Sequence, residues 1–256
     1  MATVYPYSVE VLGDRAVIEL RGDGVLAFLH NILTCSLEEL NQGQLAYGAL
    51  LSPQGKILHD VFIHERGGVI CLDCDVAQCE ALIAKLKLYR LRAKFEIVSR
   101  SDLYVQVGGE GVDDPRHPKL GPRSIAVGAA SGDAPDYKNR RFNLGIADSA
   151  EIGSGQLFPH EANFDLLGGV DFEKGCYIGQ EVVSRMQHRS TTRSRILPVR
   201  FENGQPTDEI RVAESLLGEV LGRNGQQGLA LIRLDRWAEL GAPAGLEISK
   251  LDWMKL

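Results

Sequence analysis

The sequence has no long apolar run and no recognisable leader. Nowhere does it hold the roughly 18 consecutive apolar residues that a membrane-spanning helix needs. Its start, Met1 to Tyr7, lacks the basic and apolar segments of a secretory signal peptide. We therefore expect a protein without a membrane span, and we expect it in the cytoplasm.

Cysteines are few and odd in number: Cys35, Cys71, Cys74, Cys79 and Cys176. An odd number in a chain of this size argues against a disulfide framework and agrees with a reducing compartment. Cys71, Cys74 and Cys79 lie close together, but a structural metal site needs four ligands and no second Cys or His pair follows at a typical spacing. We therefore predict no metal site.

Charge and glycine patterns exclude two further classes of ligand site. The net charge of -6 gives no general attraction to nucleic acid or to an acidic membrane. No glycine-rich phosphate loop of either familiar spacing is present. A polyanion such as tRNA would need a local basic patch, and the positions that offer one are Arg185, Arg189, Arg193 and Arg195. The alternative for this run is an ordinary solvated surface.

The 256 residues, 44% of them hydrophobic, are typical of a soluble protein of two or three domains. A strand is predicted at 15–21, followed by a helix with Asp23 as its N-cap. Strands at 45–51 and 56–64 form a hairpin around Ser52-Pro53-Gln54-Gly55, where Pro53 and Gly55 suit a type I turn.

The middle and the end of the chain differ in their predicted secondary structure. Strands at 69–72, 93–98 and 103–107 around a helix at 76–89 indicate an α+β layer with an antiparallel sheet. The segment 108–139, dense in Gly, Pro and Asp, favours a connector or functional loop, and a helix follows at 139–146. Beyond a boundary near residue 190, four short strands at 196–201, 218–223, 228–234 and 246–251 predict a small β-barrel.

One short stretch, Lys174-Gly-Cys-Tyr-Ile-Gly-Gln-Glu181, contains the clearest candidate for a reactive residue. Gly175 and Gly179 bracket a turn, and from Gly179 the pattern becomes helical. Cys176 then lies just outside a helix N-terminus and two residues after Lys174, and both features stabilise a thiolate. The alternative is that Cys176 packs as a small apolar residue.

His59 and Asp60 form a possible acid/base pair in the second hairpin strand. Adjacent strand residues point to opposite faces, so at most one of them can face a given pocket. No Ser-His-Asp order can be derived from the sequence.

The cysteine stretch resembles the signature of the YgfZ family of folate-binding proteins, relatives of the glycine-cleavage T-protein, an aminomethyltransferase. Three other segments are similar to family motifs: the hairpin at Leu50–Asp60, Asp114-Pro-Arg116 with Leu120-Gly-Pro-Arg123, and Pro159-His-Glu161-Ala-Asn163. The resemblance implies an α+β fold of three domains in a ring. Residues 1–190 would form two interleaved α+β domains, the middle one at about 45–108, and residues 191–256 the small barrel.

The resemblance also implies a site and a role. Cys176, Lys174 and Asp60 would be the reactive residues, and tetrahydrofolate would lie in the central channel. The residues implied for folate are Tyr177, Gln180, Glu181, Arg185, Glu161 and Asn163. The implied role is support of iron–sulfur cluster assembly or repair, with a link to tRNA modification. Partners would be iron–sulfur enzymes or assembly factors, and the protein would be a monomer.

Two other functions stay open at this point. The first is a folate-dependent aminomethyl- or methyltransferase. Aminomethyltransferases carry an Asp-Asp pair where this chain has His59-Asp60, so catalysis of that kind is left undecided. The second is a tRNA-binding module that uses the basic run from Arg185 to Arg195.

Overall fold

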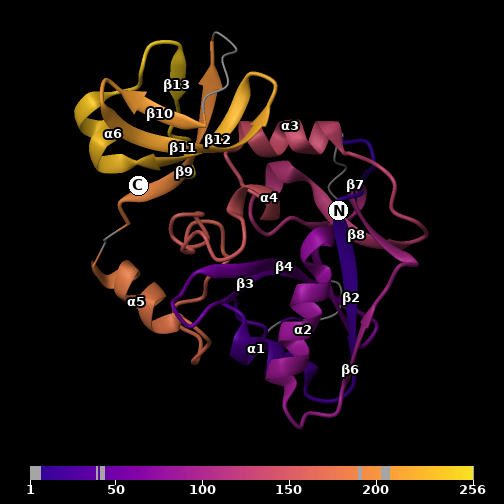
Figure 1. Cartoon of the computed structure of the whole chain (residues 1–256). Coiled ribbons are helices and arrows are strands. Elements are labelled where there is room, and N and C mark those ends of the chain that lie inside the picture. Colours follow the sequence, from indigo (N-terminus) through magenta and orange to yellow (C-terminus); the bar gives the residue numbers. More distant parts are fainter. Residues whose placement is uncertain (1–6, 39, 41–43, 190–191, 203–207, 256) are drawn as a thin grey trace.

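Three antiparallel sheets organise the computed structural model, which describes residues 7–38, 40, 44–189, 192–202 and 208–255. A five-stranded sheet has the order β3-β4-β5-β2-β6, and a three-stranded sheet the order β1-β7-β8. A second five-stranded sheet, β10-β11-β12-β9-β13, lies at the top of Figure 1, away from the other two.

The strand and helix bounds are as follows. The strands are β1 (Glu10–Leu12), β2 (Arg15–Arg21), β3 (Leu45–Leu51), β4 (Ile57–Arg66), β5 (Val69–Asp75), β6 (Glu96–Ser99), β7 (Leu103–Asp113), β8 (Pro122–Val127), β9 (Ser194–Phe201), β10 (Glu209–Val212), β11 (Ser215–Asn224), β12 (Gln227–Arg233) and β13 (Leu246–Ile248). The helices are α1 (Val25–Ile32), α2 (Cys79–Arg90), α3 (Pro135–Asn143), α4 (Ser149–Ile152), α5 (Gln180–Arg189) and α6 (Leu234–Leu240), with 3₁₀ turns η1 (Val76–Gln78) and η2 (Pro118–Leu120).

The first sheet is buried on both faces. Because side chains alternate along a strand, Val61 and Ile63 of β4 enter one core while Phe62 enters another. The first core is closed by α1 and α2, which contribute apolar residues such as Leu29 and Leu82. The second core faces the centre of the molecule, where the segment between α4 and α5 runs (Figure 1).

The hairpin predicted from the sequence is confirmed. β3 pairs with β4, and the Gly55 amide donates to the Ser52 carbonyl at 2.8 Å. Gly55 has φ of 82°, a conformation that glycine adopts without steric cost. The hairpin therefore presents a tight turn to the elements that pack on it.

The chain alternates between the two N-terminal sheets. It begins with β1 in the three-stranded sheet, crosses to the five-stranded sheet for β2 to β6, and returns for β7 and β8. The expected segment 45–108 therefore coincides with neither sheet, because β2 lies between β5 and β6 and β7 pairs with β1. The expected boundary near residue 190 lies outside the described residues.

The expectation of an irregular connector at 108–139 is wrong. The segment contains the end of β7, the turn η2 and the whole of β8. Gly108 and Gly109 have positive φ and interrupt the β7–β8 register between Val107 and Val112. The glycines thus make a bulge inside a strand, which the sequence pattern does not distinguish from a loop.

Other local predictions also need correction. Asp23 does not cap α1, because the residue before the helix is Gly24 in a left-handed conformation without a side-chain cap. The helix predicted at 139–146 is α3, which begins and ends earlier along the chain. β10 and α6 were not predicted at all. No described helix is long and apolar enough to cross a membrane.

A buried carboxylate, Asp73, joins the two N-terminal sheets. Its Oδ1 lies 2.6 Å from Arg15 Nε of β2, and its Oδ2 lies 2.6 Å from Arg123 Nε of β8. All three side chains are almost fully buried. Burial alone would raise the pKa of Asp73, but the two guanidinium groups outweigh it and hold that pKa far below its usual range.

The ion network continues toward α3 and α4 through two more arginines. Arg116 contacts Asp148 and the Tyr137 hydroxyl, at 2.5 and 2.7 Å. Arg141 contacts Asp148 at 3.0 Å and Glu151 at 2.7 Å. Buried charges are tolerated only when they are paired and hydrogen-bonded, and this network pairs its charges across five elements, β2, β5, β8, α3 and α4.

We expect Asp73→Asn to lower the free energy of unfolding by about 3–5 kcal/mol, because two buried guanidinium groups would lose their carboxylate. Urea denaturation at neutral pH measures the change. The matched control is Asp102→Asn, which removes a carboxylate paired with Arg100 but 58% exposed. The control should leave the denaturation midpoint nearly unchanged, and equal losses in both variants would contradict the prediction.

The Asp73→Asn variant should also show how the stabilisation by Asp73 depends on pH. The pKa of Asp73 is lower in the folded than in the unfolded protein, so its stabilisation is present above the unfolded value of about 3.9. It is lost progressively as the pH falls below that value. The difference in the free energy of unfolding between wild type and Asp73→Asn should therefore become smaller as the pH falls. A constant difference down to about pH 2 would contradict this prediction.

Candidate functional site at Cys176

Cys176 is the exposed cysteine of the chain. The other four, Cys35, Cys71, Cys74 and Cys79, are between 1% and 5% exposed and pack in the cores. Burial raises the pKa of the Cys35 thiol to about 12, which keeps it protonated. A thiol reagent, a metal or a partner protein in solution can therefore reach Cys176 and not the others.

The segment before Cys176 is fixed to the hairpin sheet by Thr34. The Thr34 hydroxyl donates to the Gly169 carbonyl at 2.5 Å and accepts from the Ala49 amide at 2.9 Å. The Asp171 amide donates to the Thr34 carbonyl at 2.9 Å. Asp171 Oδ1 then accepts from the amides of Glu173 and Lys174, which closes a local turn.

Lys174 anchors the same loop to α1. Its ammonium donates to the carbonyls of His30, Leu33 and Cys35, at the C-terminal end of that helix. A cation is favoured there by the unpaired carbonyls and by the helix dipole. Burial lowers the pKa of Lys174, against an opposing effect of nearby acidic groups. Because an ammonium has three hydrogens, these bonds leave none for the Cys176 sulfur.

Tyr177, Ile178 and Gly179 anchor the segment after Cys176. Tyr177 is buried in the central core, and Ile178 packs against the core beneath α1. Gly179 has φ of 81°, and a Cβ there would lie 2.6 Å from the Ser52 carbonyl oxygen. Glycine is therefore required at 179, whereas Gly175 has open space around it and no positive φ. The expectation that both glycines shape the turn holds for Gly179 alone.

Helix α5 begins at Gln180, so Cys176 precedes it by four residues. Val183 is its buried residue, and Glu181 pairs with Arg185 on the exposed side, at the i,i+4 spacing that favours such pairs on a helix. The thiol thus lies on an exposed loop held at both ends. Such a thiol can act as a soft metal ligand or as a nucleophile.

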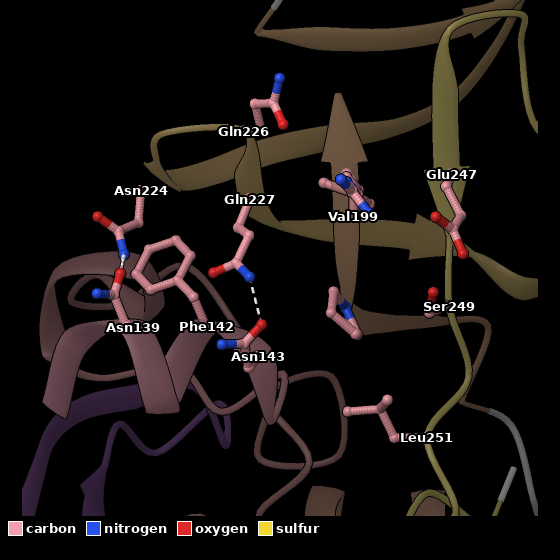
Figure 2. A pocket seen from close by; sticks show the side chains of 12 residues that line it. Asn139, Phe142, Asn143, Val199, Asn224, Gln226, Gln227, Glu247, Ser249 and Leu251 are labelled. Atoms are coloured by element: carbon pink, nitrogen blue, oxygen red, sulfur yellow. Dashed lines mark hydrogen bonds between the residues drawn. The ribbon is translucent and has the colours of Figure 1, made fainter. Parts of the chain in front are cut away.

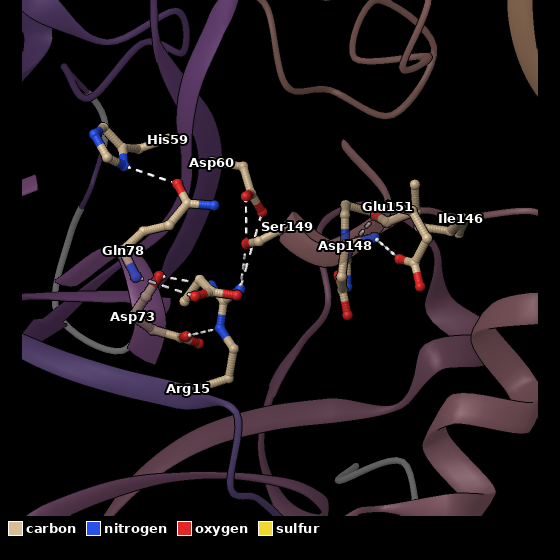
Figure 3. Close-up of polar contacts among 12 residues, drawn as sticks. Arg15, His59, Asp60, Asp73, Gln78, Ile146, Asp148, Ser149 and Glu151 are labelled. Atoms are coloured by element: carbon tan, nitrogen blue, oxygen red, sulfur yellow. Dashed lines mark hydrogen bonds and ion pairs between the residues drawn. The ribbon is translucent and has the colours of Figure 1, made fainter. Parts of the chain in front are cut away.

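Asp60 lies elsewhere, in the interior. It is 3% exposed, and its Oδ1 accepts from Ser149 Oγ at 2.5 Å (Figure 3). Its Oδ2 is 4.0 Å from Arg15 Nη1 and has no hydrogen-bond partner among the described residues. Burial raises the pKa of Asp60, although Arg15 opposes the shift. Nothing in this arrangement brings Asp60 together with Cys176.

His59 faces away from Asp60, as the strand geometry predicted. Its Nδ1 lies 3.0 Å from Gln78 Oε1, on the opposite side of β4 (Figure 3). Burial lowers the pKa of His59. The two residues therefore do not form an acid/base pair.

The residues implied for folate do not gather into one site. Asn163 donates to the Ile196 carbonyl at 2.8 Å and accepts from Arg195, so its side chain is used internally. Glu161 accepts from the Phe158 amide, and burial raises its pKa. Tyr177 is buried, whereas Gln180, Glu181 and Arg185 lie on α5, with Glu181 and Arg185 paired at the surface. As a set these residues do not fit tetrahydrofolate.

The basic run from Arg185 to Arg195 also contains both buried and exposed side chains. Arg195 is buried and forms a two-pronged ion pair with Asp165, with both oxygens at 2.8 Å. Arg189 and Arg193 are exposed. The expectation that Arg195 contributes to an RNA-binding face is therefore wrong, because its guanidinium fastens β9 to the central segment.

No group of three or more His, Cys, Asp or Glu side chains in the described residues is arranged to hold a metal ion. The described His, Cys, Asp and Glu side chains therefore do not complete a four-ligand metal site at Cys176.

Comparison with known proteins bears on both the barrel and the whole chain. Residues 193–255 match the family described as CAF17, C-terminal beta-barrel domain. A relative from Pyricularia oryzae, named iron-sulfur cluster assembly factor IBA57 homolog, mitochondrial, is 31% identical over 285 residues. The alignment covers 91% of this chain and 73% of the relative. This chain belongs to the IBA57 family.

A human relative, iron-sulfur cluster assembly factor IBA57, mitochondrial, is 28% identical over 298 residues, covering 94% of this chain and 84% of the relative. Among solved structures, the glycine cleavage system aminomethyltransferase T from Bartonella henselae superposes with a TM-score of 0.72. The superposition covers 96% of this chain and 85% of that one, at 14% identity. The T-protein-like α+β fold with a C-terminal barrel is thus confirmed.

The expected location is contradicted. The relatives from Pyricularia oryzae and human are both named as mitochondrial proteins. The inference of a cytoplasmic protein rested on the composition of residues Met1 to Tyr7. It is wrong for a family whose curated members work in an organelle.

Sequence reasoning singles out Cys176 as a candidate but does not show which residues hold its loop. Thr34 and the carbonyls at the end of α1 lie far away along the chain, with separations from Lys174 of 144 residues for His30 and 139 for Cys35. A lysine two residues from a cysteine indicates electrostatic activation only if its ammonium faces the sulfur. No local pattern shows that a lysine will instead bind a distant helix end.

We expect one of the five thiols to react rapidly with an aromatic disulfide reagent in the native protein, because four are buried. The other four should react only after unfolding. Peptide mapping should place the rapid label on Cys176, and Cys176→Ser should abolish the rapid phase. Two or more rapid thiols in the native protein would contradict the structure.

Lys174→Met tests the role of the lysine in the same assay. It should lower the free energy of unfolding by about 1–3 kcal/mol, because buried carbonyls lose their donor. The rapid thiol should react no more slowly than in wild type, because the ammonium is directed at α1. Lys138→Met, on the surface of α3, is the matched control. Slower labelling in Lys174→Met alone would show that the ammonium activates Cys176 after all.

Proposed function

We propose that this protein is an accessory factor of iron–sulfur cluster assembly or repair, and that Cys176 is its reactive thiol or transient cluster ligand. The single observation that carries the proposal is the exposure of Cys176 on an anchored loop while the other cysteines are buried. Membership of the IBA57 family supports the general role.

The chemistry of the thiol fits this role. Thiolates are preferred ligands of iron–sulfur clusters, which normally take four cysteine ligands. One exposed cysteine supplies one ligand, so an iron–sulfur protein would supply the others. Such a shared cluster is held only while the two proteins are in contact, which suits a transfer or repair step.

The anchoring of the loop supports the same proposal. Lys174 fixes one side and Tyr177 the other, so the sulfur is held without ordering of the loop on binding. Preorganised groups bind more tightly because less conformational entropy is lost in the complex. A link to tRNA modification would then pass through iron–sulfur client enzymes, since Arg195 is buried and Arg185 is paired with Glu181.

The folate-dependent transferase is the weaker alternative. It needs a carboxylate that can reach a bound cofactor, and Asp60 is 3% exposed and bonded to Ser149. Tyr47 and Phe62, which line the same interior, are buried as well. A transferase site at Asp60 would require these side chains to move, so the buried geometry does not favour a transfer step.

In cells that depend on this protein, Cys176→Ala should lower the activity of iron–sulfur enzymes to the level of a deletion. The loss follows from removal of the one reachable thiol. Enzyme activities in extracts, measured at equal protein abundance, provide the readout. Glu173→Ala, in the same loop, is the matched control and should retain activity. Wild-type enzyme activities with Cys176→Ala would overturn the proposal.

Calorimetric titration with tetrahydrofolate tests the folate implication separately. Because the implied residues do not form one pocket, we expect no saturable binding to the wild type or to Glu161→Gln. Glu161 is the informative position, since it is partly exposed and its carboxylate accepts one backbone hydrogen bond. A saturable isotherm that disappears in Glu161→Gln would contradict this expectation and identify a folate site on the central segment.

A further inference from the structure

A cavity of about 600 Å³ lies between α3, the loop of η2 and the C-terminal tail. None of its lining residues belongs to the loop that carries Cys176. That volume falls within the usual range for small-molecule sites. Its lining combines basic side chains with aromatic ones. The basic residues are His117, Lys119 and Arg140, and the aromatic residues are Tyr7 and Trp253.

Arg140 is held in place but incompletely bonded. Its guanidinium lies over the Tyr7 ring at 4.2 Å, and Nη2 is 3.6 Å from Glu10 Oε2. The Glu10 carboxylate already accepts from the amides of Asp136 and Tyr137, at 2.9 and 2.8 Å. Arg140 Nε and Nη2 are buried and have no hydrogen-bond partner among the described residues. A partly desolvated guanidinium with unused donors attracts an anion strongly.

Two more donors lie on the η2 loop. Lys119 is exposed, and its ammonium makes no ion pair with a described residue. The Lys119 amide donates to His117 Nδ1 at 3.1 Å, so the proton of a neutral His117 is on Nε2. Asp252 is the one carboxylate in the lining. Among the lining residues, the cations Lys119 and Arg140 therefore outnumber Asp252, while Glu10 lies beside Arg140 as a second carboxylate outside the lining.

Trp253 supplies a fixed aromatic wall. Its Nε1 donates to the Leu144 carbonyl at 3.0 Å, which holds the indole in one orientation while it stays partly exposed. Aromatic rings stack on such a surface, and stacking on an aromatic side chain is a general way of binding a nucleobase.

A second cavity, of about 640 Å³, adjoins the first, because both are lined by Asn143 and Leu251. Figure 2 shows side-chain amides from α3 and from the two ends of the β11–β12 turn paired with one another in the lining of this cavity. Asn224 donates to Asn139 at 2.5 Å, and Gln227 donates to Asn143. Amides offer donors and acceptors together, which is what the edge of a base or a ribose requires.

We propose that these adjoining cavities bind a nucleoside phosphate, with the phosphate at Arg140 and Lys119 and the base against Trp253. A free phosphate would leave the aromatic wall unused, and an uncharged nucleoside would leave the unused hydrogen-bond donors of Arg140 without an anion. The site uses neither of the glycine-rich loops by which phosphate binding is read from sequence.

The test uses Trp253 as its own reporter. The chain has two tryptophans, so Trp237→Phe leaves Trp253 alone. AMP and GMP are titrated into the full-length Trp237→Phe protein, with adenosine, guanosine, inorganic phosphate and tetrahydrofolate as separate probes. We expect a saturable change in Trp253 fluorescence with at least one nucleotide. The nucleosides and phosphate alone should bind at least about tenfold more weakly, because each lacks half of the contacts.

Variants in the same background locate the site. Lys119→Ala and Arg140→Ala should each weaken nucleotide binding about tenfold, the usual effect of losing a charge-assisted bond. Lys138→Ala, on the exposed face of α3 outside the cavity, should leave affinity unchanged. Thermal melting checks folding, and Lys119→Ala keeps the test valid if Arg140→Ala is unstable.

Three results would overturn the proposal. The first is no saturable response to either nucleotide. The second is an equal response to phosphate alone or a tighter response to tetrahydrofolate. The third is equal weakening by Lys138→Ala, which would show nonspecific attraction of charge. None of these results bears on Cys176, so the outcome is independent of the proposed role in cluster assembly.

Discussion

The two N-terminal sheets depend on one buried carboxylate, Asp73, held between Arg15 and Arg123. The relative positions of the two sheets are tightly constrained, because a buried charge that loses one of its partners strongly destabilises the fold. From Asp73 the ion network passes through Tyr137 and Arg116 to α3 and α4, and so to the face that meets the barrel. Asp60 is enclosed beside the same network, 3% exposed and 4.0 Å from Arg15.

The secondary structure was most predictable where local chemistry decides it. The hairpin around Gly55 follows from turn residues between two apolar strands, and the barrel strands follow from their spacing. The β7–β8 pair was missed because Gly108 and Gly109 read as a loop, although they form a bulge. The pairing of β2 between β5 and β6 could not be derived, because it is decided by contacts across the chain.

The candidate site shows the same contrast between local patterns and contacts that are distant in sequence. The position of Cys176 was visible in its motif, and its exposure agrees with a working thiol. The assignment of Lys174 as its activator failed in geometry, because the ammonium binds carbonyls that only the folded chain brings near. Motifs identify residues that must be present together. They do not show which of them face each other.

The attachment of β9 to the central segment has a consequence for biosynthesis. Ile196 exchanges hydrogen bonds with Glu161 and Asn163, and Arg195 neutralises Asp165. A nascent chain that has not yet delivered β9 carries these groups unpaired and one side of its central aromatic core uncovered. The second core, which includes Ile196 and Leu229, is therefore completed only when the last quarter of the chain has been synthesised.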